Sequence, residues 1–319
     1  MLSFYISRNF RTFSGISQKQ AADTILDTLH NARNSIIISQ SHDIYENLAF
    51  EDWLYKNCDL DDKDSSFLLI WYNGPSVVIG RFQNPWIECS VDFCNANGIS
   101  IVRRNSGGGT VYHDFGNLNF SFFKPPNNYN RKKNLEFLCE SIRRRWHINL
   151  RVSERDDILC NEQYKISGTA SKIGRTNTYH HCTILVKADE LKLRKALHRE
   201  LESITSKATS STRAKVINLN SISADIDTLK VVKAVTDYYK LIHEVEDKNL
   251  LCLRPNELIC PGYESIKENL QSWKWLFGGT PEFKVTRSFK MSSLNSSQTK
   301  SNPSCEIVLT VNKENYTVH

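Results

Sequence analysis

The segment from Arg103 to Asp114, Arg-Arg-Asn-Ser-Gly-Gly-Gly-Thr-Val-Tyr-His-Asp, combines paired arginines with three consecutive glycines. Glycine has no Cβ, so backbone N–H groups can turn inward and a flat or elongated ligand can lie against the main chain. Arg103 and Arg104 add positive charge for a phosphate. The spacing matches neither a P-loop nor the glycine turn of a dinucleotide-binding fold. The segment therefore predicts a ligand-binding loop, with a plain tight turn as the alternative.

A second group of candidate residues follows in three short stretches, at 155–158, 165–172 and 179–183. Lys165 stands just before Ser-Gly-Thr-Ala, where short neighbours can hold a lysine next to a ligand carbonyl or phosphate. The alternative interpretation is a solvent-exposed lysine at the end of a strand. His180 and His181 would point to opposite faces of a strand, so they do not predict a metal site.

The strands and helices that must position these residues are predicted from the pattern of apolar residues along the chain. Residues 67–72 and 76–80 are β-branched and aromatic runs joined by Asn73-Gly74-Pro75, which predicts strand, turn and strand. A third strand at 99–103 enters the glycine loop, and a fourth at 117–123 follows it. One face of the fourth strand, expected to be buried, consists of Leu118, Phe120 and Phe122.

Helices are predicted further along the chain. Asn134 is a candidate N-cap for an amphipathic helix, whose apolar positions are Leu135, Leu138, Ile142 and Trp146. A second helix is expected at 228–243, and residues 189–213 read as a helix followed by a mobile loop. A strand is expected at 305–311, beyond a domain boundary near residue 255. Strands and helices mix without regular alternation, so the fold class is α/β or α+β rather than doubly wound.

Composition narrows the class of protein. The 319 residues include 40% hydrophobic and 24% charged residues, which is typical of a folded globular chain. The net charge of +6 is mild, and no long basic run is interleaved with aromatic residues, so nucleic acid is not an expected partner. No apolar run approaches the roughly 20 residues that span a bilayer, so we expect a soluble protein without a membrane partner. The nine cysteines include no Cys-x-x-Cys pair, which fits a reducing compartment and predicts neither disulfides nor a metal.

The N-terminal residues 1–22 contain no Asp or Glu but include Arg8, Arg11 and Lys19 among Ser, Thr and Phe. This composition is typical of a mitochondrial transit peptide, which would be cleaved near Arg11-Thr12-Phe13-Ser14. A short disordered start is the alternative.

Three separated segments, Asn73–Glu88, Arg103–Asn119 and Lys165–Thr183, closely resemble the lipoate-protein ligase A and lipoyltransferase family. The motif Lys-Ile-Ser-Gly-Thr-Ala-Ser-Lys, followed by Tyr-His-His-Cys-Thr, looks most like that of the eukaryotic mitochondrial lipoyltransferases. The resemblance extends over roughly residues 40–285, with the motifs in the family's order.

This resemblance implies an α/β (α+β) catalytic domain like that of biotin- and lipoate-protein ligases, placed at 35–255. A small C-terminal accessory domain at 256–319 looks shortened against the family. The implied reaction transfers a lipoyl group from lipoyl-AMP to the ε-amine of a lysine on lipoyl domains of 2-oxoacid dehydrogenase subunits, in the mitochondrial matrix. Alternatives are a complete ligase that uses ATP and magnesium, and transfer from the H protein of the glycine cleavage system. No permanently bound cofactor and no metal site are implied.

The resemblance also assigns site residues. Lys165 is the expected catalytic residue, which would stabilise the oxyanion as the acceptor lysine attacks. The expected lipoyl-AMP-binding residues are Arg104, Gly107, Gly108, Gly109, Thr110, Val111, Tyr112, Arg155, Thr183 and Thr209. Arg104 and Arg155 would contact phosphate or nucleotide, and Tyr112 would close over the acyl tail.

Two rival hypotheses remain open at the level of the sequence. One is a cysteine-dependent acyltransferase in which Cys160 or Cys182 forms a thioester, although a buried structural cysteine is the simpler interpretation. The other is a non-catalytic scaffold that only binds lipoyl domains. His113 is a candidate base for the incoming amine or, equally, a hydrogen-bonded core residue.

Overall fold

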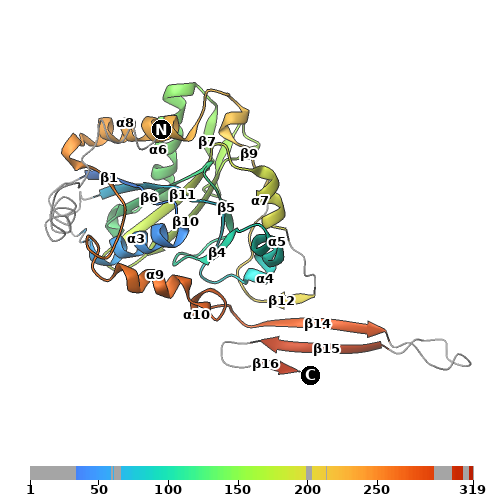
Figure 1. Cartoon of the computed structure of the whole chain (residues 1–319). Helices are drawn as coiled ribbons and strands as arrows, with labels where there is room; N and C mark the ends of the chain where they lie inside the picture. Colours follow the sequence, from blue (N-terminus) through green and yellow to red (C-terminus); the bar gives the residue numbers. More distant parts are fainter. Residues whose placement is uncertain are drawn as a thin grey trace, which may run out of the picture.

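A six-stranded mixed sheet forms the centre of the molecule (Figure 1). The computed structural model describes residues 34–58, 60, 66–198, 203–212, 214–290, 304–311 and 316–318, so the predicted transit peptide lies outside the described residues. In spatial order the strands are β10 (Ser167–Ile173), β11 (Thr178–Leu185), β6 (Asn117–Lys124), β2 (Ser66–Trp71), β1 (Asn34–Ser39) and β13 (Leu250–Leu253). β1 is parallel to β2 and β13, whereas the other pairs are antiparallel. The α/β (α+β) class is confirmed, without the parallel sheet of a doubly wound fold.

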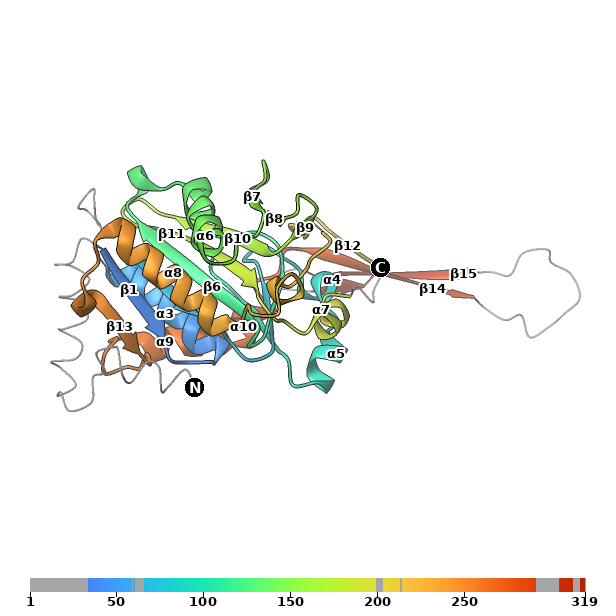
Figure 2. The same ribbon diagram turned by 90° about the horizontal axis from the view of Figure 1, so that it is seen from above.

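Helices cover both faces of this sheet (Figures 1 and 2). The helices on one face are α6 (Arg131–Trp146) and α8 (Thr228–His243), and those on the other are α3 (Ile44–Asn57) and α9 (Tyr263–Gln271). Ile36 and Ile38 of β1 pack into the core beneath α6 and α8, whereas Ile37 packs into the core beside α3. Because both faces are buried, β1, β2 and β13 read as continuous apolar runs, whereas β6 alternates apolar residues with buried Asn and Ser.

The helix predicted from Asn134 begins earlier than expected. The N-cap of α6 is Asn130, whose side chain accepts a hydrogen bond from the Lys133 amide at 2.9 Å. Asn134 is buried inside the helix, and its amide contacts His180 Nδ1 at 3.2 Å. The N-cap prediction was wrong because the first turn, Arg131 to Lys133, consists of cationic residues and lacks the apolar residues that mark a helix start. The helix predicted at 228–243 is confirmed as α8.

A second sheet holds the glycine loop. Its strands are β4 (Ser100–Arg103), β3 (Ser76–Ile79) and β5 (Val111–His113), with β3 in the middle. The predicted strands at 67–72 and 76–80 both exist as β2 and β3, but they belong to different sheets. The buried Asn73 between them is held by Asn47 of α3 at 2.8 Å and by His113 at 3.0 Å. These distant partners carry the chain into the second sheet instead of closing a hairpin.

Short helices and strands complete the part of the molecule that is built around the six-stranded sheet, which we call the body. Residues of α5 (Val91–Ala96) and α7 (Glu190–Ala196) pack on the second sheet, and α4 (Pro85–Glu88) precedes them. A third sheet consists of β7 (Leu150–Val152), β8 (Ile158–Cys160) and β9 (Tyr164–Lys165). The 3₁₀ helices are Pro126–Asn128, Leu219–Ser221 and Asp247–Asn249. Among the residues described, no helix has the length and apolar character needed to cross a membrane.

The C-terminal strands form a separate four-stranded antiparallel sheet. Its order is β12 (Ile204–Ser206), β14 (Phe283–Lys290), β15 (Ser304–Val311) and β16 (Tyr316–Val318). The β14–β15 hairpin projects away from the body (Figure 2). β12 lies within the predicted polar segment 189–213, which therefore contributes to this sheet as well as forming α7. The predicted strand at 305–311 is confirmed as β15.

The chain around the expected boundary at residue 255 packs closely on the body. β13 ends at Leu253, and beyond it α9 packs against α3. The following α10 (Trp273–Leu276) places Trp275 against the same apolar core. Residues 256–276 are thus integrated with the body, and the projecting hairpin of β14 and β15 follows them along the chain.

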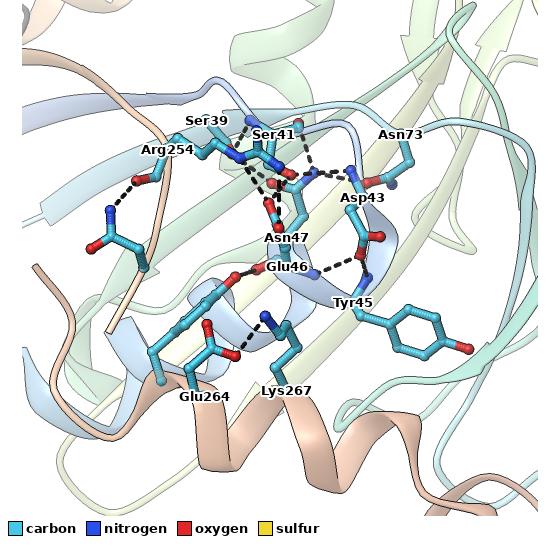
Figure 3. A network of polar contacts seen from close by, with 12 residues as sticks. Ser39, Ser41, Asp43, Tyr45, Glu46, Asn47, Asn73, Arg254, Glu264 and Lys267 are labelled. Atoms are coloured by element: carbon cyan, nitrogen blue, oxygen red, sulfur yellow. Dashed lines mark hydrogen bonds and ion pairs between the residues drawn. The ribbon is translucent and has the colours of Figure 1, made fainter. Parts of the chain in front are cut away.

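A polar network joins this C-terminal part to the start of α3 (Figure 3). Asp43 caps α3 by accepting hydrogen bonds from the amides of Tyr45 at 2.7 Å and Glu46 at 3.0 Å. Glu46 in turn accepts from Ser41 at 2.6 Å and from two nitrogens of Arg254 at 3.2 Å. Burial alone would raise the pKa of Glu46, but the hydrogen bonds from Ser41 and Arg254 outweigh it and lower the pKa.

Candidate active site

A cavity of about 550 Å³ lies where β5, β9, β10, β11 and α7 meet. Its size is within the range of pockets that bind small molecules and cofactors. The lining residues are Glu88, Thr110, Val111, Tyr112, Asn117, Tyr164, Lys165, Ser167, Gly168, Thr183, Leu185, Glu190, Leu193, Arg194, Leu197, Ser211, Thr212, Ala214, Lys215 and Val216. The wall combines aliphatic residues such as Leu185 and Leu193 with cations on both β9 (Lys165) and α7 (Arg194), so the cavity can accept a ligand with both a flat apolar part and a negative charge.

Lys165 is held at this cavity by the hairpin of β8 and β9. Asn161 and Glu162 both have positive φ, at 48° and 62°, which is the conformation of a tight hairpin turn. The Lys165 amide donates to the Lys215 carbonyl at 2.9 Å, and the Ile217 amide donates to the Lys165 carbonyl at 3.2 Å. The lysine is therefore fixed on both sides of its backbone, and its ammonium lies 2.7 Å from Asp157 Oδ1.

The turn between β7 and β8 supplies Asp157 and Arg155. Ser153 Oγ accepts from the Asp157 amide at 3.1 Å and from the Arg155 amide at 3.3 Å. The Arg155 guanidinium donates to the hydroxyl of Thr212 at 3.2 Å. One serine-centred turn thus aims a carboxylate at Lys165 and a guanidinium at a residue of the cavity wall.

Two glycines are required at the predicted loop, Gly108 by its backbone conformation and Gly80 of the neighbouring strand end by a close approach. Gly108 has φ of +82°, a conformation that side chains rarely adopt. A Cβ on Gly80 would lie 2.1 Å from the Gly108 carbonyl oxygen, and one on Gly109 would lie 3.2 Å from Ser211 Oγ. The loop therefore folds between β3 and the 209–212 segment, and its amide at Thr110 donates to Ser211 Oγ at 2.8 Å.

Arg104 is buried beneath the loop rather than exposed in the large cavity. Its guanidinium donates to Ser106 Oγ at 2.9 Å, to the Val78 carbonyl at 3.0 Å and to the Gly109 carbonyl at 2.7 Å. A further bond reaches the Gly107 carbonyl at 2.5 Å. This placement favours a structural role for the guanidinium, since it shapes the loop from below, over the phosphate contact expected from the sequence.

The loop is also tied to a buried polar chain. Glu51 accepts from Ser121 Oγ at 2.6 Å and lies 3.0 Å from His181 Nδ1. His181 Nε2 lies 2.9 Å from Ser106 Oγ, the same oxygen that accepts from Arg104. The arrangement resembles a hydrolase triad in outline, but Ser106 is buried and does not line the cavity. This series of hydrogen-bonded side chains from Glu51 to Arg104 therefore positions the glycine loop and does not supply a nucleophile.

His113 does not have the properties of the base considered from the sequence. Its Nδ1 lies 3.0 Å from the amide nitrogen of Asn73, which can only donate, so the ring proton is assigned to Nε2. Burial, followed by the charge of Arg104 and His181, lowers the pKa of His113 to about 3. A neutral ring with its proton on Nε2 is a hydrogen-bond donor at this position, not a proton acceptor.

A smaller pocket of about 30 Å³ continues inward from the cavity. Val111, Gly168 and Thr183 line both spaces. The residues that line only the inner pocket are Leu48, Trp71, Val78, Arg104, Gly109, His113, Asn119, Thr169, Ala170, His181 and Cys182. The inner pocket is mostly apolar, but at about 30 Å³ it has room for only about two water molecules and must widen before it can take an apolar tail.

Two buried side chains of the cavity wall lack hydrogen-bond partners among the described residues. They are Asn117, whose Oδ1 and Nδ2 are both unpaired, and Tyr112, whose hydroxyl is unpaired. Burial also raises the pKa of Tyr112. Buried polar groups are normally paired, so unpaired ones in residues that line a cavity are consistent with a polar ligand.

The eight cysteines whose side chains the structure describes are buried, and none of them forms a disulfide. Burial raises the pKa of Cys160 and of Cys182, which disfavours the thiolate that a thioester mechanism requires. Within the described ranges, no group of His, Cys, Asp or Glu is arranged to hold a metal ion.

The structure brings most of the predicted site residues together. The predicted residues that line the large cavity are Thr110, Val111, Tyr112, Lys165 and Thr183, and those on the inner pocket are Arg104, Gly109, Val111 and Thr183. Gly107 and Gly108 form the loop between them, and Arg155 reaches the wall through Thr212. Thr209 lies on neither wall, and its carbonyl accepts from Gln83 at 3.3 Å.

The sequence interpretation missed other cavity residues. Asn117 ends the glycine motif and Glu88 ends the first family-like segment, so both were within quoted stretches. Ser211, Thr212 and Arg194 belong to a polar region without a recognisable motif. Only long-range contacts place these three at the site.

Comparison with known proteins defines the class of this fold. The structure of P. falciparum LipL1 in complex with lipoate superposes with a TM-score of 0.67 at 26% identity, covering 89% of this chain and 84% of that one. A bipartite lipoate protein ligase from Thermoplasma acidophilum has the same fold, with a TM-score of 0.62 at 23% identity over 77% of this chain and 96% of that one. The fold is that of a lipoate-ligase catalytic domain.

Sequence comparison gives the family. The model of the lipoyl protein ligase A/B catalytic domain matches residues 43–240. Human mitochondrial lipoyl amidotransferase LIPT1 is 40% identical over 259 residues, covering 81% of this chain and 69% of that protein. Lipoate-protein ligase A of Psychrobacter cryohalolentis is 34% identical over 249 residues, covering 74% of this chain and 70% of that protein. The chain belongs to the lipoyl protein ligase A/B catalytic domain family and is an enzyme of protein lipoylation, as the sequence motifs predicted.

Proposed function

We propose that this protein transfers the lipoyl group of lipoyl-AMP to the ε-amine of a lysine on an acceptor domain. The observation that supports this most directly is the cavity of about 550 Å³ that combines Lys165 with an apolar wall, together with the small apolar pocket beyond Val111. An acyl adenylate has a nucleotide at one end and an apolar chain at the other. The large cavity would take the nucleotide, and the inner pocket, which at about 30 Å³ has room for about two water molecules, would have to widen for the chain. The acyl carbonyl would then lie between them, near Lys165.

The chemistry needed from the protein is limited because the mixed anhydride is already activated. The acceptor amine attacks the acyl carbon, a C–N bond forms, the C–O bond to phosphate breaks, and AMP leaves while the amine loses a proton. Positioning and stabilisation of the developing oxyanion supply the catalysis. Lys165 is the residue proposed for this stabilisation, with its ammonium oriented by Asp157 at 2.7 Å.

The remaining wall residues are assigned by their chemistry. The unpaired amide of Asn117 and the aliphatic side chains of Leu185, Leu193 and Leu197 suit a flat nucleobase. Arg155 and Thr212 would contact the nucleotide, and Thr183 and the glycine loop would border the acyl carbonyl and tail. No permanently bound cofactor is proposed.

The acceptors proposed are lipoyl domains of 2-oxoacid dehydrogenase acyltransferase subunits, and the H protein of the glycine cleavage system is a further candidate. The names of the human and mouse relatives place those proteins in mitochondria. We propose the mitochondrial matrix for this protein, with residues 1–22 as the transit peptide.

The test is the mass of an apo lipoyl domain after incubation with this protein. Pre-formed lipoyl-AMP is compared with lipoate plus ATP and magnesium as the donor. Modification from lipoyl-AMP alone is the expected result. Modification from both donors would establish a complete ligase, and modification from neither would refute the adenylate as donor and direct attention to transfer from the H protein or to a scaffold.

A further inference from the structure

Ser211 is the junction of several segments at the cavity, and its hydroxyl uses its full hydrogen-bonding capacity. Its Oγ accepts from the Thr110 amide at 2.8 Å and from Gln83 Nε2 at 3.0 Å. The same hydroxyl donates a hydrogen bond to the carboxylate of Glu88. A hydroxyl has one donor and two acceptor positions, so all three are occupied here.

Glu88 holds Ser211 in place through hydrogen bonds. It is a carboxylate at the end of α4 that is only 5% exposed and lines the cavity. Besides the Ser211 hydroxyl, it accepts from the Ser211 backbone amide at 3.2 Å. Bonds from a donor to an ionised acceptor are stronger than those between neutral groups, so the contact with Glu88 is the strongest of the set.

Gln83 secures the same segment from the β3 side. Its Oε1 accepts from Thr110 Oγ1 and from the Gly80 amide, both at 2.8 Å. Its Nε2 also donates to the Thr209 carbonyl at 3.3 Å, and the Thr209 amide donates to the Phe82 carbonyl at 3.2 Å. The segment packs closely on Gly109, where a Cβ would lie 3.2 Å from Ser211 Oγ.

We propose that Glu88 is a positioning residue that, through Ser211, clasps the 209–212 segment across the cavity and thereby retains the acyl adenylate. The next residue, Thr212, lines the cavity and binds Arg155, so release of Ser211 would open the wall beside the nucleotide. This inference rests on the proposed function for its ligand. A mixed anhydride is hydrolysed by water, so a closed wall protects it until the acceptor lysine arrives.

The variants are Glu88→Gln, Ser211→Ala and the double variant, with Glu268→Gln on the exposed side of α9 as the control. Glu88→Gln keeps the shape but places an amide N–H₂ where one of the two Ser211 donors must bind. The first readout is hydrogen exchange of residues 209–212 in the ligand-free protein. Exchange there should rise at least tenfold in each variant, while the amides of β6 remain unchanged.

The second readout follows pre-formed lipoyl-AMP bound to the protein. Loss of the adenylate by dissociation or hydrolysis without acceptor should rise about tenfold. The rate of lipoyl transfer from the saturated complex should change less than threefold, and the double variant should be no worse than the worse single variant because the two residues act as one unit. The control should match the parent protein in both readouts.

The outcomes separate the two proposals. Unchanged exchange at 209–212, or adenylate loss equal to that of the parent, overturns the clasp. A transfer rate that falls in proportion to retention also overturns it, because Glu88 would then act on the reacting atoms. If the parent protein neither binds nor uses lipoyl-AMP, the proposed donor is wrong, while the exchange readout still decides whether Glu88 holds the segment.

Discussion

At the residue scale, Lys165 is the side chain on which the proposed chemistry depends. Its Nζ is paired with Asp157, and its backbone is fixed by Lys215 and Ile217. Removal of one donor that stabilises an oxyanion usually costs about 3 kcal/mol of barrier. We expect Lys165→Ala to slow single-turnover transfer from lipoyl-AMP by a hundredfold or more.

The matched control for this prediction is Lys187→Ala, an exposed lysine outside the cavity. It should transfer at the parent rate. A Lys165→Ala protein with near-normal transfer would remove this residue from the mechanism.

Two glycines that flank β3 give a second prediction at this scale. A Cβ on Gly80 would lie 2.1 Å from the Gly108 carbonyl oxygen, whereas one on Gly74 would meet its nearest atom at 3.7 Å. We expect Gly80→Ala to lower the free energy of unfolding by about 3 kcal/mol and to disturb the glycine loop. Gly74→Ala should stay within about 0.5 kcal/mol of the parent in urea unfolding. Equal effects of the two substitutions would contradict the close approach of β3 to the loop.

At the scale of elements, Arg103 joins β4 to two other segments. Its buried guanidinium donates to the carbonyls of Gly80, Arg81 and Gln83. It also donates to carbonyls of α10 and to the Thr280 hydroxyl. Burial, and then the charge of Arg81, lowers its pKa to about 10, so it is still charged at neutral pH.

Arg103→Met should therefore leave several buried carbonyls without a donor. Each such group typically costs 1–3 kcal/mol, and we expect a loss of roughly 3 kcal/mol in urea unfolding after relaxation. The exposed Arg175→Met serves as the control. A loss below about 0.5 kcal/mol would show that α10 is held by its apolar contacts alone.

The ion pair between Glu46 and Arg254 gives a pH-dependent prediction. The folded state lowers the pKa of Glu46, so its contribution is present above the unfolded pKa and is lost as pH falls through the folded value. Glu46→Gln should cost about 1 kcal/mol of unfolding free energy at pH 7, because Arg254 is largely exposed. The difference from the parent should vanish at acidic pH, below the folded pKa. A constant difference across this range would mean that the charge of Glu46 is not involved.

At the scale of the whole molecule, the body and the projecting sheet differ in burial. Phe289 of β14 is 53% exposed and Ile307 of β15 is 41% exposed, whereas the apolar residues of β6 are buried. Few buried contacts mean a low free energy of local opening. We expect the amides of β14 and β15 to exchange at least a hundredfold faster than those of β6. Comparable protection in both sheets, measured by native-state hydrogen exchange, would disprove this difference.

Many of the strands and helices, and part of the candidate site, could be predicted from short stretches of the sequence. The apolar runs predicted β2, β3, β4, β6 and α8, because burial requires continuous or periodic apolar residues. The glycine loop and Lys165 were found because their chemistry depends on neighbours within a few positions. The same motifs revealed the family, which the comparisons confirmed.

Only the tertiary structure decided how these pieces meet. Ser211 contacts Thr110 across 101 positions of the chain, and no local pattern encodes such a distance. The placement of β2 and β3 in different sheets follows from the contacts of Asn73 with Asn47 and His113. The cavity, the unpaired Asn117 and the buried position of Arg104 follow in the same way, because burial and hydrogen bonding are properties of the packed chain and not of its order.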